Sequence, residues 1–277
     1  MNNILDGKLV RDERKKILID KVSKLDKKLT LVDVNVGFDE ASKIYIKQKE
    51  KMALSIGYNF INLHFDKIDE EDLIKEIEKL NEDVNITGII VQLPLPDYLN
   101  KDKILNAISP LKDVDGLTNS NLLKLINKED GLLPCTPKGI VSLLDYYNID
   151  LHKNVVIVGR SKLVGYPLFN MLLNRDATVT ICHSKTKNLS NYTKDADILI
   201  VAVGKKGLIT KDMIKENVII VDVGINRVDD KIYGDVDLDC IEKALYMTPV
   251  PGGVGPMTVI SLMENVYLAY LKQRTIN

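Results

Sequence analysis

Short runs rich in valine and isoleucine alternate with helical patterns along this chain, and this alternation limits the choice of fold most. Three such runs, expected to be buried strands, span residues 29–36, 59–65 and 86–93. Helical patterns at 39–56 and 70–81 separate them. Strands that alternate with helices through short connections form βαβ units and a parallel sheet. The sequence therefore predicts an α/β fold.

A second series of the same kind begins at Asn154. An apolar run at 155–158 leads into a glycine-containing turn and a helix to about Asn174, and further strands are expected at 178–182, 198–203 and 218–223. Between the two series, Pro134-Cys135-Thr136-Pro137 is a natural boundary, and Thr136-Pro137 suits the start of a helix at Lys138. With 277 residues, the chain is long enough for two domains.

Charge and composition exclude several classes of protein. Lys plus Arg number 38 and Asp plus Glu number 39, a net charge of −1, which argues against nucleic-acid or membrane-surface binding through bulk charge. No apolar run approaches the ~20 residues that cross a bilayer, and the first residues do not resemble a signal peptide. Three histidines and three widely spaced cysteines indicate neither a metal site nor a disulfide framework. We therefore expect no bound metal and a reduced, cytoplasmic compartment.

A glycine-containing turn follows the first strand of the second series. Gly159-Arg160-Ser161-Lys162-Leu163-Val164-Gly165 opens a helix, where bare backbone N–H groups bind a pyrophosphate. The motif departs from GxGxxG, because Ser161 replaces the middle glycine and the last glycine lies one residue late. On its own, the motif is equally consistent with a structural turn.

The end of the next strand bears on the choice of cofactor. An NAD site usually carries an acidic residue roughly 20 residues after the first glycine, to bind the ribose hydroxyls. This chain instead has His183, Ser184 and Lys185 there, with Arg160 in the preceding turn. Such donors would hold a 2′-phosphate, which a carboxylate would repel, so the sequence favours NADP over NAD. The alternative is that His183 and Lys185 are solvated loop residues.

The helix expected at 39–56 carries lysines on two faces. Ser42, Tyr45 and Lys49 share one face at i, i+3 and i+4 spacings. Three other lysines recur four residues apart on a different face and form an ordinary solvated stripe: Lys43, Lys47 and Lys51. Lys49 lies roughly 160° to 200° from the last two on a helix that turns ~100° per residue. Lysine is rarely buried without a partner, although a lysine that snorkels to solvent would fit the same pattern.

Two further motifs lie in the first series. Val91-Gln92-Leu93-Pro94 places a glutamine at the carboxyl end of a strand, where parallel sheets bind ligands. Lys112-Asp113-Val114-Asp115-Gly116 places two acids in a turn. The structural alternatives are that Gln92 satisfies loop backbone and that one of the acids caps the following helix.

A loop rich in glycine and proline is expected at residues 248–258, with the sequence Thr-Pro-Val-Pro-Gly-Gly-Val-Gly-Pro-Met-Thr. Its glycines permit positive φ and close backbone approach, and its prolines limit its freedom. These properties favour a loop that contacts a ligand, with a tight packing loop as the alternative.

Together these motifs resemble, in the same order, those of the methylenetetrahydrofolate dehydrogenase/methenyltetrahydrofolate cyclohydrolase family. The resemblance extends from about Leu5 to Tyr267. One departure follows Gly116, where the family often has Phe-His-Pro-x-Asn and this chain has Leu-Thr-Asn-Ser-Asn, ending at Asn121.

The resemblance implies a role for each motif. Tyr45 would stack on the folate ring, and the catalytic group would be Lys49, Gln92 and Asp115, with Gln92 orienting Lys49 and Asp115 bound to the pterin. The substrate would also contact Val91, Leu93, Pro251, Gly252, Gly253, Val254 and Gly255. The cofactor would contact Thr136, Gly159, Arg160, Ser161, His183, Ser184, Gly224 and Ile225, with Asn226 beside them.

The resemblance further implies two α/β domains with parallel sheets flanking a cleft. Residues 1–136, completed by a C-terminal helix at 258–277, would bind folate, and residues 137–257 would form a Rossmann-type NADP domain. The enzyme would oxidise 5,10-methylenetetrahydrofolate and hydrolyse the methenyl product to 10-formyltetrahydrofolate, in one-carbon metabolism and purine biosynthesis. Its partners would be tetrahydrofolate derivatives, with or without polyglutamate tails, and a second copy of the chain in a homodimer.

Two other functions remain as alternatives. If the protein were a dehydrogenase without cyclohydrolase activity, Lys49 or Gln92 would be expected to be absent, and both are present. A non-catalytic nucleotide-binding module predicts a first domain without the motifs described above.

Overall fold

The computed structural model describes residues 3–37, 40–229 and 231–276. The chain forms two compact units, and each unit combines two separate stretches of sequence. Unit 1 consists of Met1–Glu13 and Thr136–Thr258, and unit 2 of Arg14–Cys135 and Val259–Asn277.

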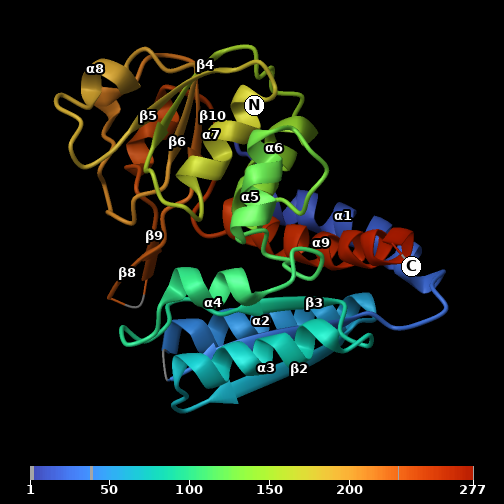
Figure 1. The fold of residues 1–277 in the computed structure, drawn as a ribbon. Coiled ribbons are helices and arrows are strands. Elements are labelled where there is room, and N and C mark those ends of the chain that lie inside the picture. Colours follow the sequence, from blue (N-terminus) through green and yellow to red (C-terminus); the bar gives the residue numbers. More distant parts are fainter. Residues whose placement is uncertain (1–2, 38–39, 230, 277) are drawn as a thin grey trace. The chain divides into compact units, whose positions relative to one another are not determined.

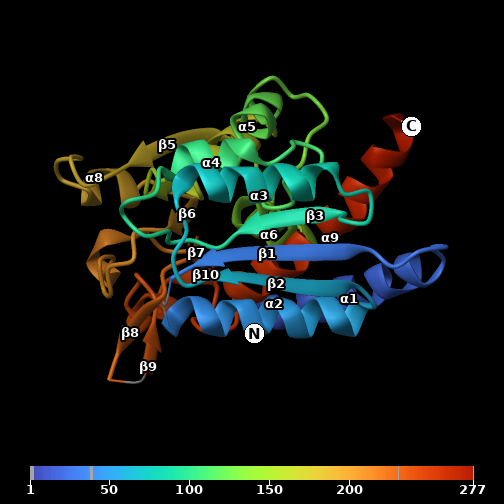
Figure 2. The same cartoon turned by 60° about the horizontal axis from the view of Figure 1, so that its bottom comes forward.

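Unit 2 contains a three-stranded parallel sheet in the order β2-β1-β3, with β1 (Thr30–Val36) between β2 (Asn59–Phe65) and β3 (Gly88–Val91) (Figure 2). The connecting helices are α2 (Glu40–Ile56) and α3 (Glu70–Glu82), followed by α4 (Lys101–Ala107) and α5 (Asn119–Ile126). The parallel pairing confirms the βαβ prediction for this part of the chain. Asp39, where a helix was expected to begin, lies outside the described residues.

The two faces of β1 have different chemistry, because successive side chains in a strand point to opposite faces. One face contributes three valines, at 32, 34 and 36, to a core that includes Leu73 and Ile77 of α3. The other face carries Leu31, Asp33 and Asn35, all buried. Asp33 lies in ion-pair contact with a lysine of α2, so the polar face of β1 is turned toward that helix.

The prediction that residues 59–65 form a buried strand is correct for the strand and wrong for its burial. β2 lies at an edge of the sheet, where β1 is its neighbour. Its side chains are exposed or half-buried along the whole strand, and Ile61 is 44% exposed. β3 is also an edge strand of this sheet and is buried, so a run rich in apolar residues did not distinguish an exposed edge strand from a covered one.

Unit 1 contains a five-stranded parallel sheet, in which Figure 1 labels β4, β5, β6 and β10. The order of its strands is β10-β7-β6-β4-β5. Its strands are β4 (Asn154–Val158), β5 (Thr178–Cys182), β6 (Ile198–Val201), β7 (Val218–Asp222) and β10 (Ala244–Met247). Helices α6 (Cys135–Tyr146), α7 (Gly165–Leu173) and α8 (Ser190–Thr193) and an antiparallel hairpin, β8 (Asn226–Val228) with β9 (Lys231–Tyr233), complete it. This doubly wound parallel sheet is the Rossmann-type arrangement that the sequence predicted.

Helices α1 (Gly7–Ser23) and α9 (Val254–Ile276) are each divided between the two units, and α6 begins at the last residue of the first stretch of unit 2. The first thirteen residues belong to unit 1, whereas the sequence analysis placed them with residues 14–136. Backbone hydrogen bonds explain the difference, because Leu5 N donates to Met247 O and Met247 N donates to Asn3 O beside strand β10.

Helix α9 also begins earlier than predicted, at Val254 rather than Thr258. Pro256 lies in its first turn, where a missing N–H costs no helical hydrogen bond. Within the described residues, no helix combines the length and apolar character needed to cross a membrane.

Candidate active site

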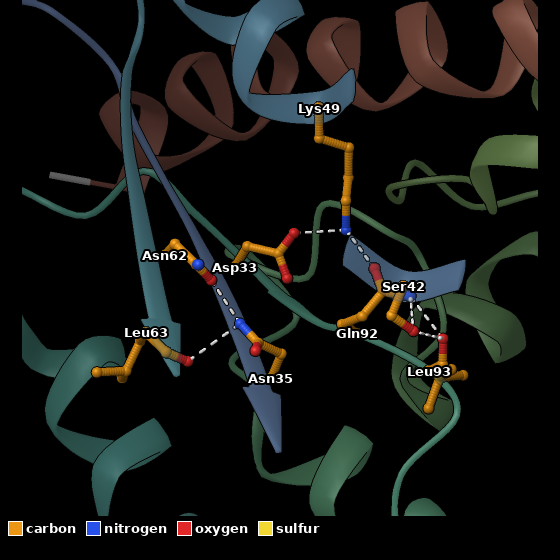
Figure 3. A network of polar contacts seen from close by, with 8 residues as sticks. All are labelled: Asp33, Asn35, Ser42, Lys49, Asn62, Leu63, Gln92 and Leu93. Atoms are coloured by element: carbon orange, nitrogen blue, oxygen red, sulfur yellow. Dashed lines mark hydrogen bonds and ion pairs between the residues drawn. The ribbon is translucent and has the colours of Figure 1, made fainter. Parts of the chain in front are cut away.

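Lys49 is the buried lysine of α2, with 9% of its surface exposed, whereas Lys43, Lys47 and Lys51 are exposed. Its ammonium donates a hydrogen bond to Gln92 Oε1 at 2.7 Å and lies 2.5 Å from Asp33 Oδ2 (Figure 3). The prediction that Lys49 differs from the solvated stripe is confirmed.

Gln92 follows directly after β3 and is fixed by both backbone and side chain. Its N–H donates to Val34 O at 2.8 Å, and its Nε2 donates to Leu93 O at 2.5 Å. With Nε2 engaged in this way, Oε1 is directed at Lys49 (Figure 3). Gln92 therefore satisfies loop backbone and holds the lysine at the same time.

The two acids of the turn at 113–115 have different surroundings. Asp113 is buried and accepts hydrogen bonds from Leu117 N, Thr118 N and Asn121 Nδ2, so its role is structural. Asp115 is half-buried, and its burial raises its pKa to about 6; the charge of Asp113 acts in the same direction, while Lys49 opposes it. Asp115 therefore lies within electrostatic range of Lys49.

The departure from the family pattern after Gly116 has a local structural role. Thr118 is the N-cap of α5, and its hydroxyl accepts from Asn121 N. Asn121 is buried and donates to Pro110 O. From α9, Asn265 donates to Val114 O at 2.8 Å and to Leu133 O at 2.8 Å, which fixes the acidic turn from the other side.

The structure brings Tyr45, Lys49, Gln92 and Asp115 together in unit 2. Tyr45 lies one turn before Lys49 on α2 and is 36% exposed. Val91 is buried and Leu93 half-buried. A pocket of about 330 Å³ in the same unit is lined by Gln92 together with Asn35, Ser42, Lys47 and His64, whereas Tyr45, Lys49 and Asp115 do not line it.

Sequence analysis missed two polar residues of this site, Asp33 and Asn265. Both are completely buried. The available signal was a polar residue within an apolar run, and it is clearest for Asp33, in the string Leu-Val-Asp-Val-Asn-Val.

In unit 1, the turn between β4 and α7 requires glycine at two positions. Gly159 has a φ of +128°, and a Cβ there would lie 2.4 Å from Ala202 O. A Cβ on Gly165 would lie 2.0 Å from Gly159 O. Ser161 Oγ accepts from Val164 N at 3.1 Å. This bare turn at the start of a nine-residue helix fits the pyrophosphate of a dinucleotide.

The polar residues predicted to hold the rest of the cofactor are also in unit 1. Arg160, Ser161 and Ser184 are exposed, and the exposed fraction of Ile225 is 46%. His183 is half-buried, and its Nδ1 accepts from Lys185 N at 3.2 Å. The remaining predicted residues are the half-buried Thr136 and the buried Gly224, where a Cβ would collide with Asp235.

The predicted loop Pro251–Gly255, whose last two residues begin α9, also belongs to unit 1. Gly252 has a φ of +117°, and Gly253 N donates to Pro249 O at 2.8 Å. A Cβ on Gly7 would lie 1.8 Å from Gly253 O, so the start of α1 contacts this loop directly. The loop is thus well anchored, and it lies in a different unit from Tyr45 and Lys49.

Two family models match the chain. Residues 5–115 match the tetrahydrofolate dehydrogenase/cyclohydrolase catalytic domain, and residues 134–274 match the NAD(P)-binding domain of the same family. The chain belongs to this family. It is 50% identical over 273 residues to the bifunctional protein FolD of Acholeplasma laidlawii, and the match covers 98% of this chain and 99% of that protein.

Solved structures agree with this assignment. The bifunctional FolD methylenetetrahydrofolate dehydrogenase/cyclohydrolase of Campylobacter jejuni has a TM-score of 0.97 and 44% identity, covering 99% of this chain and 100% of that one. The Trypanosoma brucei FolD, complexed with NADP cofactor and an inhibitor, has a TM-score of 0.94 and 32% identity over 98% of both chains. The α/β fold and the family predicted from the motifs are therefore confirmed.

Proposed function

We propose that this chain catalyses two consecutive reactions on a folate substrate. The first oxidises 5,10-methylenetetrahydrofolate to the 5,10-methenyl cation with NADP. The second adds water to that cation and opens its ring, which yields 10-formyltetrahydrofolate and a proton. The nicotinamide, when bound, accepts the hydride that leaves the one-carbon bridge.

The observation that supports both steps in one site is the buried ammonium of Lys49, hydrogen-bonded to Gln92 Oε1 at 2.7 Å. Hydride transfer needs mainly correct placement of the substrate. Water addition also needs protons to move, and a held lysine is a suitable proton donor or acceptor. A dehydrogenase alone would not need this arrangement.

The remaining residues of unit 2 bind the substrate in this proposal. The Tyr45 ring, exposed beside Lys49, would stack on the folate ring system. Asp115 would accept hydrogen bonds from the pterin, together with contacts from Val91 and Leu93. The loop Pro251–Gly255, anchored in unit 1, would cover the folate, whose polyglutamate tail would extend into solvent.

The cofactor would be held by unit 1. Backbone N–H groups of the turn from Gly159 to Ser161 would bind the pyrophosphate, and the exposed Arg160 and Ser184 would bind the 2′-phosphate of NADP. Thr136, His183, Gly224 and Ile225 would complete the site. We further propose a cytoplasmic homodimer that associates through the cofactor-binding unit.

Two assays test the proposal. Purified protein is supplied with methylenetetrahydrofolate and either NADP or NAD, and the reduced nicotinamide is measured. Methenyltetrahydrofolate is then supplied without nucleotide, and its hydrolysis is followed against a reaction without enzyme. We expect activity in both assays and a higher kcat/KM with NADP. Equal kcat/KM values for the two nucleotides would contradict the cofactor assignment. If the protein did not catalyse the hydrolysis, only the dehydrogenase part of the proposal would remain.

A further inference from the structure

Strand β1 carries an aspartate between the apolar residues Val32 and Val34. Every residue of the strand is buried, and Asp33 is completely so. Apart from Lys49, its carboxylate oxygens receive no hydrogen bond from the described residues. Burying a carboxylate is costly unless a partner compensates for the lost hydration. Stability alone therefore does not explain an aspartate at this position.

Asp33 and Gln92 both contact the same atom, Lys49 Nζ. Asp33 pairs in register with Ile90 of β3, two residues before Gln92. Strand β1 and the residue that follows β3 thus supply an acceptor each, Asp33 Oδ2 at 2.5 Å and Gln92 Oε1 at 2.7 Å, to the Lys49 ammonium (Figure 3). Two acceptors from these two places define the position of the ammonium more closely than Gln92 alone.

The charge of Asp33 also matters for the reaction proposed above, on which this inference rests. The methenyl intermediate is a cation, and a buried ammonium beside it would repel it. Asp33 compensates the charge of Lys49 inside the protein. The second carboxylate that acts on this lysine, Asp115, comes from the turn before α5 and is in turn influenced by Asp113. Burial raises the pKa of Asp33, and Lys49 opposes that shift.

We propose that Asp33 is a positioning residue for Lys49: its carboxylate fixes the ammonium against Gln92 and compensates its charge when the methenyl cation binds. Removing this carboxylate disfavours the protonated amine relative to the neutral one. We therefore expect a shift in the pH–rate profile of the cyclohydrolase reaction. The part of the profile that reflects protonation of Lys49 should move to lower pH, whether the protonated or the neutral amine is the active form.

The test compares Asp33→Asn, which keeps the shape and removes the charge, with Asp72→Asn on the exposed surface of α3. For Asp33→Asn we expect the limb to move by about one pH unit or more. We also expect kcat of the cyclohydrolase to fall more than kcat of the dehydrogenase. Asp72→Asn should leave the profile in place. An unmoved limb, with both reactions reduced by the same factor, would show that Asp33 is merely structural and overturn the proposal.

A stability measurement covers the case in which Asp33→Asn folds poorly, and it requires no substrate. As a single substitution, Asp33→Asn should lower the Tm of the protein, because it leaves the Lys49 ammonium without its counter-ion. In a Lys49→Met background, Asp33→Asn should raise the Tm, because it removes a carboxylate that has lost its partner. A shift of the same sign in both backgrounds would overturn the ion-pair assignment. Failure of the unmutated protein in the folate assays would instead count against the proposed function.

Discussion

At the scale of single residues, Lys49 is the point on which the chemistry depends. It is buried among polar partners, while Lys47, two positions earlier on α2, is exposed. The two lysines lie on the same helix and have the same side chain but different surroundings, so they can be compared directly by mutation.

Replacing Lys49 with Met keeps most of the side chain and removes the ammonium. The cyclohydrolase rate should fall by about 10²–10⁴-fold, the range for loss of a general acid or base. Hydride transfer should fall less, because it does not require that proton. Some loss of stability is expected, since Asp33 loses its partner. Assays of both reactions check this, with Lys47→Met as the control; equal cyclohydrolase rates for the two variants would contradict the role of Lys49.

Asp115 gives the site a pH dependence. Its pKa is raised from 3.8 to about 6, chiefly by burial. Between these values the folded protein holds a proton that the unfolded chain has lost, so this group's contribution to the free energy of unfolding decreases as the pH rises through that window. Above about pH 6 the carboxylate is free to accept hydrogen bonds from the pterin.

We therefore expect the KM for methylenetetrahydrofolate to rise as the pH is lowered through about 6, whereas Asp115→Asn should have a KM that changes little over the same range. Steady-state kinetics across this interval measure it. The KM for NADP in the same experiments is an internal control. A folate KM with the same pH dependence in both proteins would exclude Asp115 as its source.

At the scale of elements, α5 depends on an identifiable cap. Thr118 is 2% exposed, and its hydroxyl accepts from Asn121 N at the first turn of the helix. Thr118→Ala should lower the free energy of unfolding by about 1 kcal/mol, the usual cost of losing an N-cap. Denaturant unfolding measures the change. Ser120→Ala, at an exposed position of the same helix, should change stability by much less, and equal effects would indicate that the cap contributes nothing.

The elements also show how far sequence patterns reach. The predicted helix at 70–81 corresponds to α3 (Glu70–Glu82), and the strand predicted at 178–182 is β5. Periodic apolar spacing is a local property, so it identifies such elements well. Whether an edge strand is covered is not a local property, because it depends on what packs against it; β2 was therefore expected to be buried, like the other edge strand, β3. The early start of α9 was missed for a related reason, since Gly255 and Pro256 indicate a loop unless their place in a first helical turn is known.

The site was predictable to a similar degree. Lys49 was singled out by its helical face and Gln92 by its place at the end of a strand, whereas their pairing was implied by the family resemblance; in the structure the two side chains share a hydrogen bond. Asp33 could not be found in this way, because its importance comes from burial opposite Lys49, which no spacing along the chain reveals. Asn265 acts from a helix more than a hundred residues beyond the turn that it fixes.

At the scale of the whole molecule, the candidate folate and nucleotide residues are divided between the two units. Asp115 belongs to unit 2, whereas Arg160 belongs to unit 1. Substitutions at these positions should therefore affect different ligands.

Arg160→Ala should reduce the preference for NADP over NAD by about tenfold to a hundredfold, since a lost charge-assisted hydrogen bond costs roughly 1.5–3 kcal/mol. Its affinity for folate should change little. The matched variant, Asp115→Ala, should show the opposite result, with weakened folate binding and nearly unchanged NADP affinity. Separate titrations of each ligand measure both, and an Arg160→Ala variant that retains its full NADP preference would remove Arg160 from the 2′-phosphate site.

The interleaving of the two units has a consequence for synthesis on the ribosome. Arg14–Cys135 emerge before most of unit 1, but unit 2 also requires Val259–Asn277, which emerge after it. Two hydrogen bonds to α9 illustrate the dependence: Asn265 Nδ2 donates to Val114 O in the acidic turn, and the Tyr58 hydroxyl donates to Met263 O. A nascent chain that extends to residue 258 thus contains every part of the nucleotide-binding unit, while the unit that holds Lys49 still lacks its closing helix. Unit 2, most of which is translated before most of unit 1, is therefore the later of the two units to be completed.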